Sequence, residues 1–242
     1  MNEVIQQLFD RKSVRVFTDR EIAPEDKALI LDAAAHAPTA GNQQLYTILD
    51  ITDPAIKEKL VDTCDHQPFI AESKLTLIFC ADCLKWNDAY AYAGCDPRQP
   101  GVGDLLLAVS DALIAAQNAV VAAQSMGIGS CYIGDIMENY EEQKALLGLP
   151  AHVFPAAMLV FGYPTEHQLQ RPKPLRSPRE RIVHENGYHR MDASQLQKLL
   201  EVKAGQQEYS TWLQAFCQRK YNSDFSKEMT RSVKKYLEEY KF

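Results

Sequence analysis

Apolar positions along this chain follow two spacings, which together predict helices alternating with short strands. Recurrence every three or four residues predicts helices at 2–10, 24–36, 54–61, 104–126, 138–147, 192–219 and 223–240. Compact runs rich in Val, Ile, Leu and Phe predict strands at 46–52, 74–81, 132–133 and 156–162. Segments 84–103 and 164–181 follow neither spacing and are predicted to be irregular; long loops of this kind are often functional.

The predicted helix at 104–126 is the longest and is apolar nearly all round. Such a helix is expected to be buried on every side, which in a chain of this size suggests a subunit interface over its surface. Polar residues interrupt the apolar run at Asp111, Gln117, Asn118 and Gln124. We therefore interpret it as a core helix and not as a membrane span. Gly127 is placed to cap its C-terminus.

The mixture of strands and longer helices predicts an α+β fold with a mostly antiparallel sheet. The length of 242 residues fits one large domain with an extension. We place a core domain at residues 1–190 and a C-terminal helical extension at 191–242.

Charge narrows the possible partners. The chain carries 26 Lys or Arg and 32 Asp or Glu, a net charge of −6. This balance argues against nucleic acid and anionic membranes as main partners, because both attract basic surfaces. The first residues lack the basic and long apolar regions of a secretory signal, so a cytoplasmic location is expected.

The chain has six cysteines, which in a cytoplasmic protein are expected to be free thiols. Cys80 and Cys83 form a C-x-x-C pair, but no second pair follows at the spacing of a zinc site. The pair also closes a predicted strand, whereas a redox dithiol of the thioredoxin kind opens a helix. Neither metal binding nor dithiol chemistry is expected here.

Four segments carry candidate chemistry, and each has a plain structural alternative. Residues 11–17 hold Arg11, Lys12 and Arg15 beside the Ser13 hydroxyl, a set suited to an anion or to a solvated helix end. Residues 37–44 form a polar loop with two adjacent amides, and 127–135 place a short strand between glycines. Residues 171–176 form a basic loop stiffened by prolines. None of the four is decisive alone.

In this order and spacing, the segments resemble the nitroreductase family of FMN-dependent NAD(P)H oxidoreductases. The matching motifs are Arg-Lys-Ser-x-Arg-x-Phe at 11–17, Ala-Pro-Thr-x-x-Asn-x-Gln at 37–44, Gly-Ile-Gly-Ser-x-Tyr-Ile-Gly at 127–134 and Val-His-Glu-Asn at 183–186. The chain most resembles the NADPH-preferring branch with a C-terminal helical extension. The resemblance implies a sheet wrapped by helices and an intertwined homodimer with FMN at the subunit interface.

The resemblance also implies roles for individual residues. Cations at the start of the chain would surround the FMN phosphate and pyrimidine edge, polar side chains would contact the ring or ribityl chain, and backbone N–H groups near Gly134 would approach the ring at N5. The implied FMN residues are Arg11, Lys12, Ser13, Val14, Arg15, Thr39, Asn42, Gln67, Cys131, Tyr132, Ile133, Gly134, Lys173 and Arg176. Which basic residue of 171–176 contacts phosphate stays open.

The implied activity is transfer of a hydride from NADPH to flavin and then of two electrons to nitroaromatics, quinones or free flavin, by a ping-pong mechanism. No catalytic acid or base is assigned. Arg219 and Lys220 are candidates for the 2′-phosphate of NADPH, with a solvated helix face as the alternative. Two other readings remain open: a reductase that supplies reduced FMN to a partner, and a flavin-binding sensor without turnover.

Overall fold

The computed structural model describes residues 1–240 and contains two compact units. The first unit joins residues 1–171 to the C-terminal part of the chain from Glu228 onward, and the second is Pro172–Lys227. The functional boundary placed at residue 190 stays a prediction.

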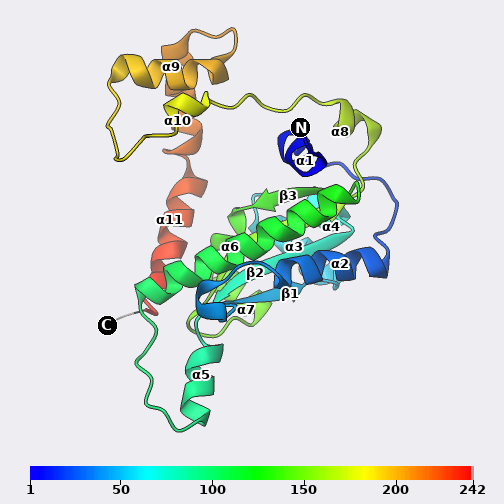
Figure 1. Cartoon of the computed structure of the whole chain (residues 1–242), viewed down its shortest axis with the longest axis vertical. Coiled ribbons are helices and arrows are strands. Elements are labelled where there is room, and N and C mark those ends of the chain that lie inside the picture. The colour runs from blue at the N-terminus through cyan, green and yellow to red at the C-terminus, as the bar shows by residue number, and fades with distance from the viewer. Residues whose placement is uncertain (241–242) are drawn as a thin grey trace. The chain divides into compact units, whose positions relative to one another are not determined.

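Four antiparallel strands form one sheet in the first unit, in the order β1-β2-β4-β3 (Figure 1). β2 (Leu75–Asp82) and β4 (Val153–Gly162) are central, with β1 (Tyr46–Asp50) and β3 (Gly129–Ile133) at the edges. Every residue of β2 and β4 is buried, which explains why both appear in the sequence as continuous apolar runs. The pairing confirms the expected α+β class with an antiparallel sheet.

Helices cover both faces of this sheet (Figure 1). Leu77 and Phe79 of β2 pack with α2 (Pro24–Ala35) and α6 (Val102–Ser125). Ile78, between them in sequence, points to the other face, where α3 (Pro54–Thr63), α4 (Phe69–Glu72) and α7 (Tyr140–Leu147) lie. This alternation follows from the two-residue period of a strand, so β2 contributes to two apolar layers at once.

The long helix α6 crosses one face of the sheet, and its buried side is lined by alanines that allow close packing. Its other side is also apolar but exposed: Leu106 is 62 % exposed, and Leu113 and Ile114 are each 39 % exposed. This side is not buried within one chain, and its burial in a subunit interface stays a prediction. Among the described residues, α6 is the one helix long and apolar enough to cross a membrane. Of its most apolar 18-residue stretch, 44 % is buried.

The last described part of the chain, from Glu228 in α11 (Asp224–Leu237) to Tyr240, is anchored in the first unit. The Tyr236 ring packs edge-on against Tyr140 and Phe154, with centroids 4.6 and 5.0 Å away. Glu239 accepts a 2.6 Å hydrogen bond from the Tyr140 hydroxyl and pairs with Lys144. The C-terminal segment is thus part of the core of the first unit.

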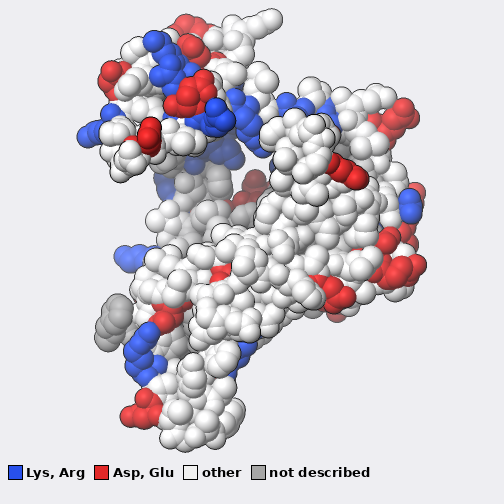
Figure 2. Space-filling model, viewed as in Figure 1, with Lys and Arg blue, Asp and Glu red and all other residues white. Residues whose placement is uncertain are grey.

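The second unit contains α9 (Ala193–Ala204) and α10 (Tyr209–Lys220). A single helix over 192–219 is wrong, because the chain turns at Gly205, whose φ of 62° favours glycine. This unit has ten Lys or Arg and six Asp or Glu, so it is basic within an acidic chain. Figure 2 shows its cationic side chains.

The shorter elements account for the remaining differences from expectation. The segments predicted to be irregular contain α5 (Lys85–Tyr92), α8 (Glu166–Gln170) and the 3-10 turn η3 (Arg179–Arg181). The N-terminal helix α1 (Glu3–Asp10) agrees with the predicted helix at 2–10. Two further 3-10 turns, η1 (Ala40–Asn42) and η2 (Asp135–Met137), follow α2 and β3.

Candidate functional site

The basic segment after α1 runs beside β3. Ser13 forms a parallel bridge with Ser130, and the Val14 N–H donates to the Ser130 carbonyl over 3.0 Å. This approach requires glycine at position 129, because a Cβ there would lie 2.5 Å from Val14 Cγ2. The motifs at 11–17 and 127–134, far apart in sequence, are therefore neighbours in space.

The three cations of this segment have different surroundings. The Arg11 guanidinium lies over the Tyr132 ring, with its carbon 5.7 Å from the centroid. Lys12 donates to the carbonyls of Leu169, over 2.6 Å, and of Arg171. Arg15 is exposed, stands 5.9 Å from the Phe69 ring centroid, and has no carboxylate partner among residues 1–240. Arg15 is therefore a cation available to an anionic ligand.

The strand beside this segment presents both buried and open positions. Burial raises the pKa of the Cys131 thiol, although the charge of Arg15 and a hydrogen bond with Ser13 oppose the shift. Burial likewise raises the pKa of Tyr132 to about 12. A Cβ at Gly134 would have Met137 Cε, 3.9 Å away, as its nearest neighbour, so the space above this backbone is open.

Gln67 joins this group from the turn before α4. Its Nε2 donates to Asp135 Oδ2 over 2.6 Å and to the Cys64 carbonyl over 2.9 Å. Asp135 directly follows Gly134, so Gln67 is held beside the end of β3. Ile133, between Tyr132 and Gly134, is buried.

The loop with Thr39 and Asn42 is fixed by Asp111, which in the sequence stands out only as an interruption of an apolar helix. Asp111 is 3 % exposed and accepts hydrogen bonds from the Thr39 hydroxyl and from two backbone N–H groups, those of Ala40 at 3.1 Å and Leu45 at 3.2 Å. The loop has a tight path, with Asn42 at a φ of 57°. A carboxylate within an otherwise apolar helix is the signal in the sequence that could have indicated this role.

The predicted residues thus fall into separate groups. One group lies together around β3 and contains Arg11, Lys12, Ser13, Val14, Arg15, Gln67, Cys131, Tyr132, Ile133 and Gly134. Thr39 is attached to the middle of α6 through Asp111, and Asn42 lies in the same loop. Lys173, Arg176, Arg219 and Lys220 belong to the second unit. Their approach to the first group stays a prediction.

Glu138 is a further buried acid, and no sequence pattern predicts it. It lies just after η2 and is 4 % exposed, with Oε1 unpartnered among the described residues. Burial, the nearby carboxylates of Asp135, Asp65 and Glu228, and a hydrogen bond with Asp135 raise the pKa of Glu138 to about 7. Glu138 therefore lies close to the carboxyl group that holds Gln67.

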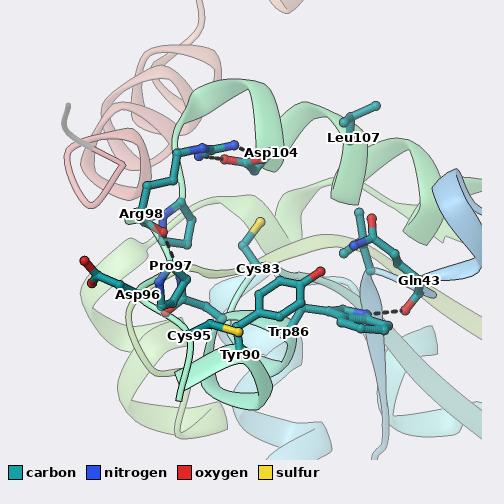
Figure 3. Close-up of a pocket in the computed structure, with 13 residues that line it drawn as sticks. Gln43, Cys83, Trp86, Tyr90, Cys95, Asp96, Pro97, Arg98, Asp104 and Leu107 are labelled. Carbon is teal, nitrogen blue, oxygen red and sulfur yellow. Dashed lines mark hydrogen bonds and ion pairs between the residues drawn. The ribbon is translucent and has the colours of Figure 1, made fainter. Parts of the chain in front are cut away.

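Both thiols of the C-x-x-C pair are buried: Cys80 is fully buried, and Cys83 is 7 % exposed. Burial raises the pKa of Cys80 to about 12 and that of Cys83 to about 11, so both are protonated at neutral pH. Cys83 also faces a hollow of about 400 Å³ between α5 and the start of α6 (Figure 3).

Comparison with known proteins agrees with this architecture. A model of the nitroreductase family matches residues 8–163. FMN reductase (NAD(P)H) of Bacillus subtilis is 30% identical over 242 residues, which cover 98% of this chain and 92% of the relative. Oxygen-insensitive NADPH nitroreductase of Salmonella typhimurium is 35% identical over 205 residues, 84% of this chain and 82% of the relative.

Solved structures share the fold across nearly the whole length. NfrA2 of B. megaterium is 30% identical, with a TM-score of 0.84 over 100% of this chain and 99% of that one. NfrA1 of B. megaterium is 28% identical, with a TM-score of 0.83 over 97% and 98%. Together with the matched motifs and the shared fold, these findings show that the chain belongs to the nitroreductase family.

Proposed function

We propose that this chain is an NADPH-dependent FMN oxidoreductase that reduces nitroaromatics, quinones or free flavin by a ping-pong mechanism. The observation that carries the proposal is the juxtaposition of the basic segment with the end of β3. Relatives named FMN reductase and NADPH nitroreductase support the same activity. When bound, FMN would supply the hydride and electron chemistry.

The residues around β3 fit such a cofactor. Arg15 brings a positive charge without a carboxylate partner among residues 1–240, as an anionic phosphate or pyrimidine edge requires. Gly134 leaves open space over the backbone, which lets a flat ring approach closely. Gln67 has its amide nitrogen engaged by Asp135 and Cys64, so its oxygen is the atom left to accept a hydrogen bond from a ligand.

We assign the other predicted residues to supporting roles. Lys12 ties the basic segment to the chain around Arg171. Ser13, Val14 and Cys131 shape the contact between this segment and β3, and Thr39 and Asn42 contact the ring or ribityl chain. Lys173 and Arg176 complete the phosphate grip, and Arg219 and Lys220 bind the 2′-phosphate of NADPH. No side chain is assigned as a catalytic acid or base.

We also propose a homodimer. The exposed apolar side of α6 offers Leu106, Leu113 and Ile114, and α1 exposes Val4 and Phe9 to 56 % and 60 %. Apolar surface of this extent is typical of an interface. A location in the cytoplasm, with neither nucleic acid nor membrane as partner, stays a prediction.

The absorbance spectrum of the purified protein, followed by anaerobic titration with NADPH, tests the proposed function. We expect the bands of oxidised flavin, bleached by about one NADPH per flavin, and re-oxidation by an added quinone. A colourless protein would contradict FMN as the cofactor. A yellow protein that NADPH does not bleach would instead support the flavin-binding sensor.

A further inference from the structure

The basic segment contacts the end of β4 and the residues after it as well as β3. The Phe17 backbone forms an antiparallel bridge with Pro164. Gly162 permits this approach, because a Cβ there would lie 2.6 Å from Phe17 Cδ1. The segment that carries the proposed phosphate cations is therefore held at two places far apart in sequence, β3 and residues 162–171.

The short helix α8 lies beside this segment (Figure 1). Lys12 donates to the carbonyls of Leu169 and Arg171 on the C-terminal side of α8. The backbone N–H of Arg15 donates to Gln168 Oε1 over 3.2 Å. Gln168 is thus the α8 side chain that contacts the backbone of Arg15.

Gln168 is buried far more deeply than is usual for a glutamine, with 2 % of its surface exposed. Its backbone N–H donates to the Thr165 hydroxyl over 3.4 Å at the start of α8. Its amide nitrogen has no hydrogen-bond partner in the part of the chain that the structure describes. A buried donor without a partner lowers stability, so packing alone does not favour a glutamine at this position.

The hydrogen bond to Arg15 gives this glutamine a place in the proposed cofactor site. Arg15 is exposed and has no carboxylate partner among residues 1–240, so no ion pair fixes its guanidinium. Its backbone is fixed instead, through the Val14 N–H bond to the Ser130 carbonyl and the Arg15 N–H bond to Gln168. A fixed backbone limits where the guanidinium can reach, which lowers the entropy lost when an anion binds.

We propose that Gln168 is a positioning residue for FMN, whose amide oxygen holds the Arg15 backbone so that the guanidinium meets the anionic cofactor. The proposal rests on the proposed function and extends it to a residue outside the matched motifs. Gln168 acts through Arg15 and does not itself contact FMN. Its replacement should therefore weaken FMN binding without loosening the fold, and should have little effect once the Arg15 guanidinium is absent.

A double-mutant cycle on the FMN affinity of the apoprotein, measured by quenching of flavin fluorescence, tests the proposal. The variants are Gln168→Met, Arg15→Ala and the two combined, with Gln170→Ala as the control, because Gln170 is an exposed glutamine on the same helix. Methionine keeps the size of the side chain and removes the acceptor. We expect Gln168→Met to raise the dissociation constant roughly three- to tenfold, the size of one hydrogen bond. Gln170→Ala, and Gln168→Met in the Arg15→Ala background, should each change it by less than about twofold.

Two further measurements on the same apoproteins separate positioning from a purely structural role. The Arg15 amide should exchange its hydrogen faster in Gln168→Met than in the wild type. The midpoint of urea unfolding should stay unchanged, because the substitution also removes the unpaired donor. If circular dichroism shows Gln168→Met to be unfolded, Thr165→Ala replaces it: this variant removes the hydroxyl that accepts from the Gln168 backbone and should weaken FMN binding by about two- to threefold.

Three results would overturn the proposal. The first is equal FMN affinity in the Gln170→Ala control and in the folded test variant. The second is additive effects of Gln168→Met and Arg15→Ala in the double variant. The third is an Arg15 amide that exchanges equally in Gln168→Met and the wild type. A wild-type apoprotein that binds no FMN contradicts the proposed function, and the exchange of the Arg15 amide still decides whether Gln168 holds this backbone.

Discussion

The Gln67 amide nitrogen donates to the Asp135 carboxylate over 2.6 Å, which joins the turn before α4 to the turn after β3. The buried Glu138 lies close to Asp135, whose carboxylate helps to raise the pKa of Glu138. A side chain proposed to face the flavin is therefore held by one acid, and a second, buried acid lies close to that one. This relationship makes the pH dependence of the first unit predictable.

Glu138→Gln is expected to flatten the dependence of stability on pH. The pKa of Glu138 is about 7 in the folded protein, against an ordinary value of 4.5, so the folded state holds a proton that the unfolded chain releases. The stabilisation from this proton is complete below about pH 4.5 and is lost as the pH rises through about 7. Urea unfolding of the wild type should therefore show a decline on the order of 2 kcal/mol across this range that Glu138→Gln lacks.

Glu142→Gln is the matched control, because Glu142 is an exposed acid on the adjacent helix α7. It should keep the wild-type decline. Parallel pH profiles for Glu138→Gln and the wild type would show that Glu138 is not the titrating group. Asp135, Asp65 and Glu228 face it and would then have to be tested in turn.

Asp111→Ala should destabilise the first unit. The substitution removes the acceptor for the Thr39 hydroxyl and for two backbone N–H groups, which stay without partners in a buried place. We expect a loss of about 2–4 kcal/mol in the free energy of unfolding. Asp32→Ala, which removes an exposed acid from α2, should change this free energy by less than about 0.5 kcal/mol. Equal effects in urea titrations would mean that Asp111 does not hold the loop.

Two substitutions at Tyr236 should have different effects on the free energy of unfolding. The ring packs between Tyr140 and Phe154, so Tyr236→Ala is expected to cost about 3–5 kcal/mol. The hydroxyl is buried without a hydrogen-bond partner among the described residues, so Tyr236→Phe should be neutral or stabilising by up to about 1 kcal/mol. Chemical denaturation measures both, and a destabilised Tyr236→Phe variant would reveal a polar contact at this hydroxyl.

The patterns in the sequence predict elements whose stability comes from a local apolar face. β2 and α6 are long apolar segments, and both lie where the sequence predicts them. α5 escapes prediction because none of its residues is buried, so no apolar spacing marks it. The break at Gly205 escapes because helical spacing continues on both sides of it.

The residues of the candidate site divide in the same way. Ser13 and Tyr132 are predicted from motifs, because the resemblance assigns those motif positions to a cofactor site. Asp111 and Glu138 act through burial and through partners far away in sequence, at Thr39 and Glu228. Only the folded chain reveals those partners. The interruption of an apolar helix marks Asp111 in the sequence, but no local pattern marks Glu138.

Replacing Arg219 and Lys220 together by alanine should raise KM for NADPH far more than KM for NADH. Both side chains lie against rings at the end of α10, at 5.3 Å from Phe216 and 5.1 Å from Phe225, which leaves their charges available to a 2′-phosphate. Lys198→Ala combined with Lys203→Ala removes the same charge from exposed positions on α9 and serves as the control. Equal changes for the two nucleotides would refute the assignment.

The affinity of the apoprotein for FMN tests the central claim, that the basic segment beside β3 holds the cofactor. Quenching of FMN fluorescence would be titrated with the wild type, Arg15→Ala and Arg20→Ala. Arg20 is an exposed cation five residues along, stacked 3.8 Å from the Tyr163 ring centroid, and is the control. We predict that Arg15→Ala weakens binding by about tenfold or more, the scale of one charge-assisted contact, and that Arg20→Ala leaves it within about twofold. Equal affinities for the two variants, or no FMN binding by the wild type, would contradict the claim.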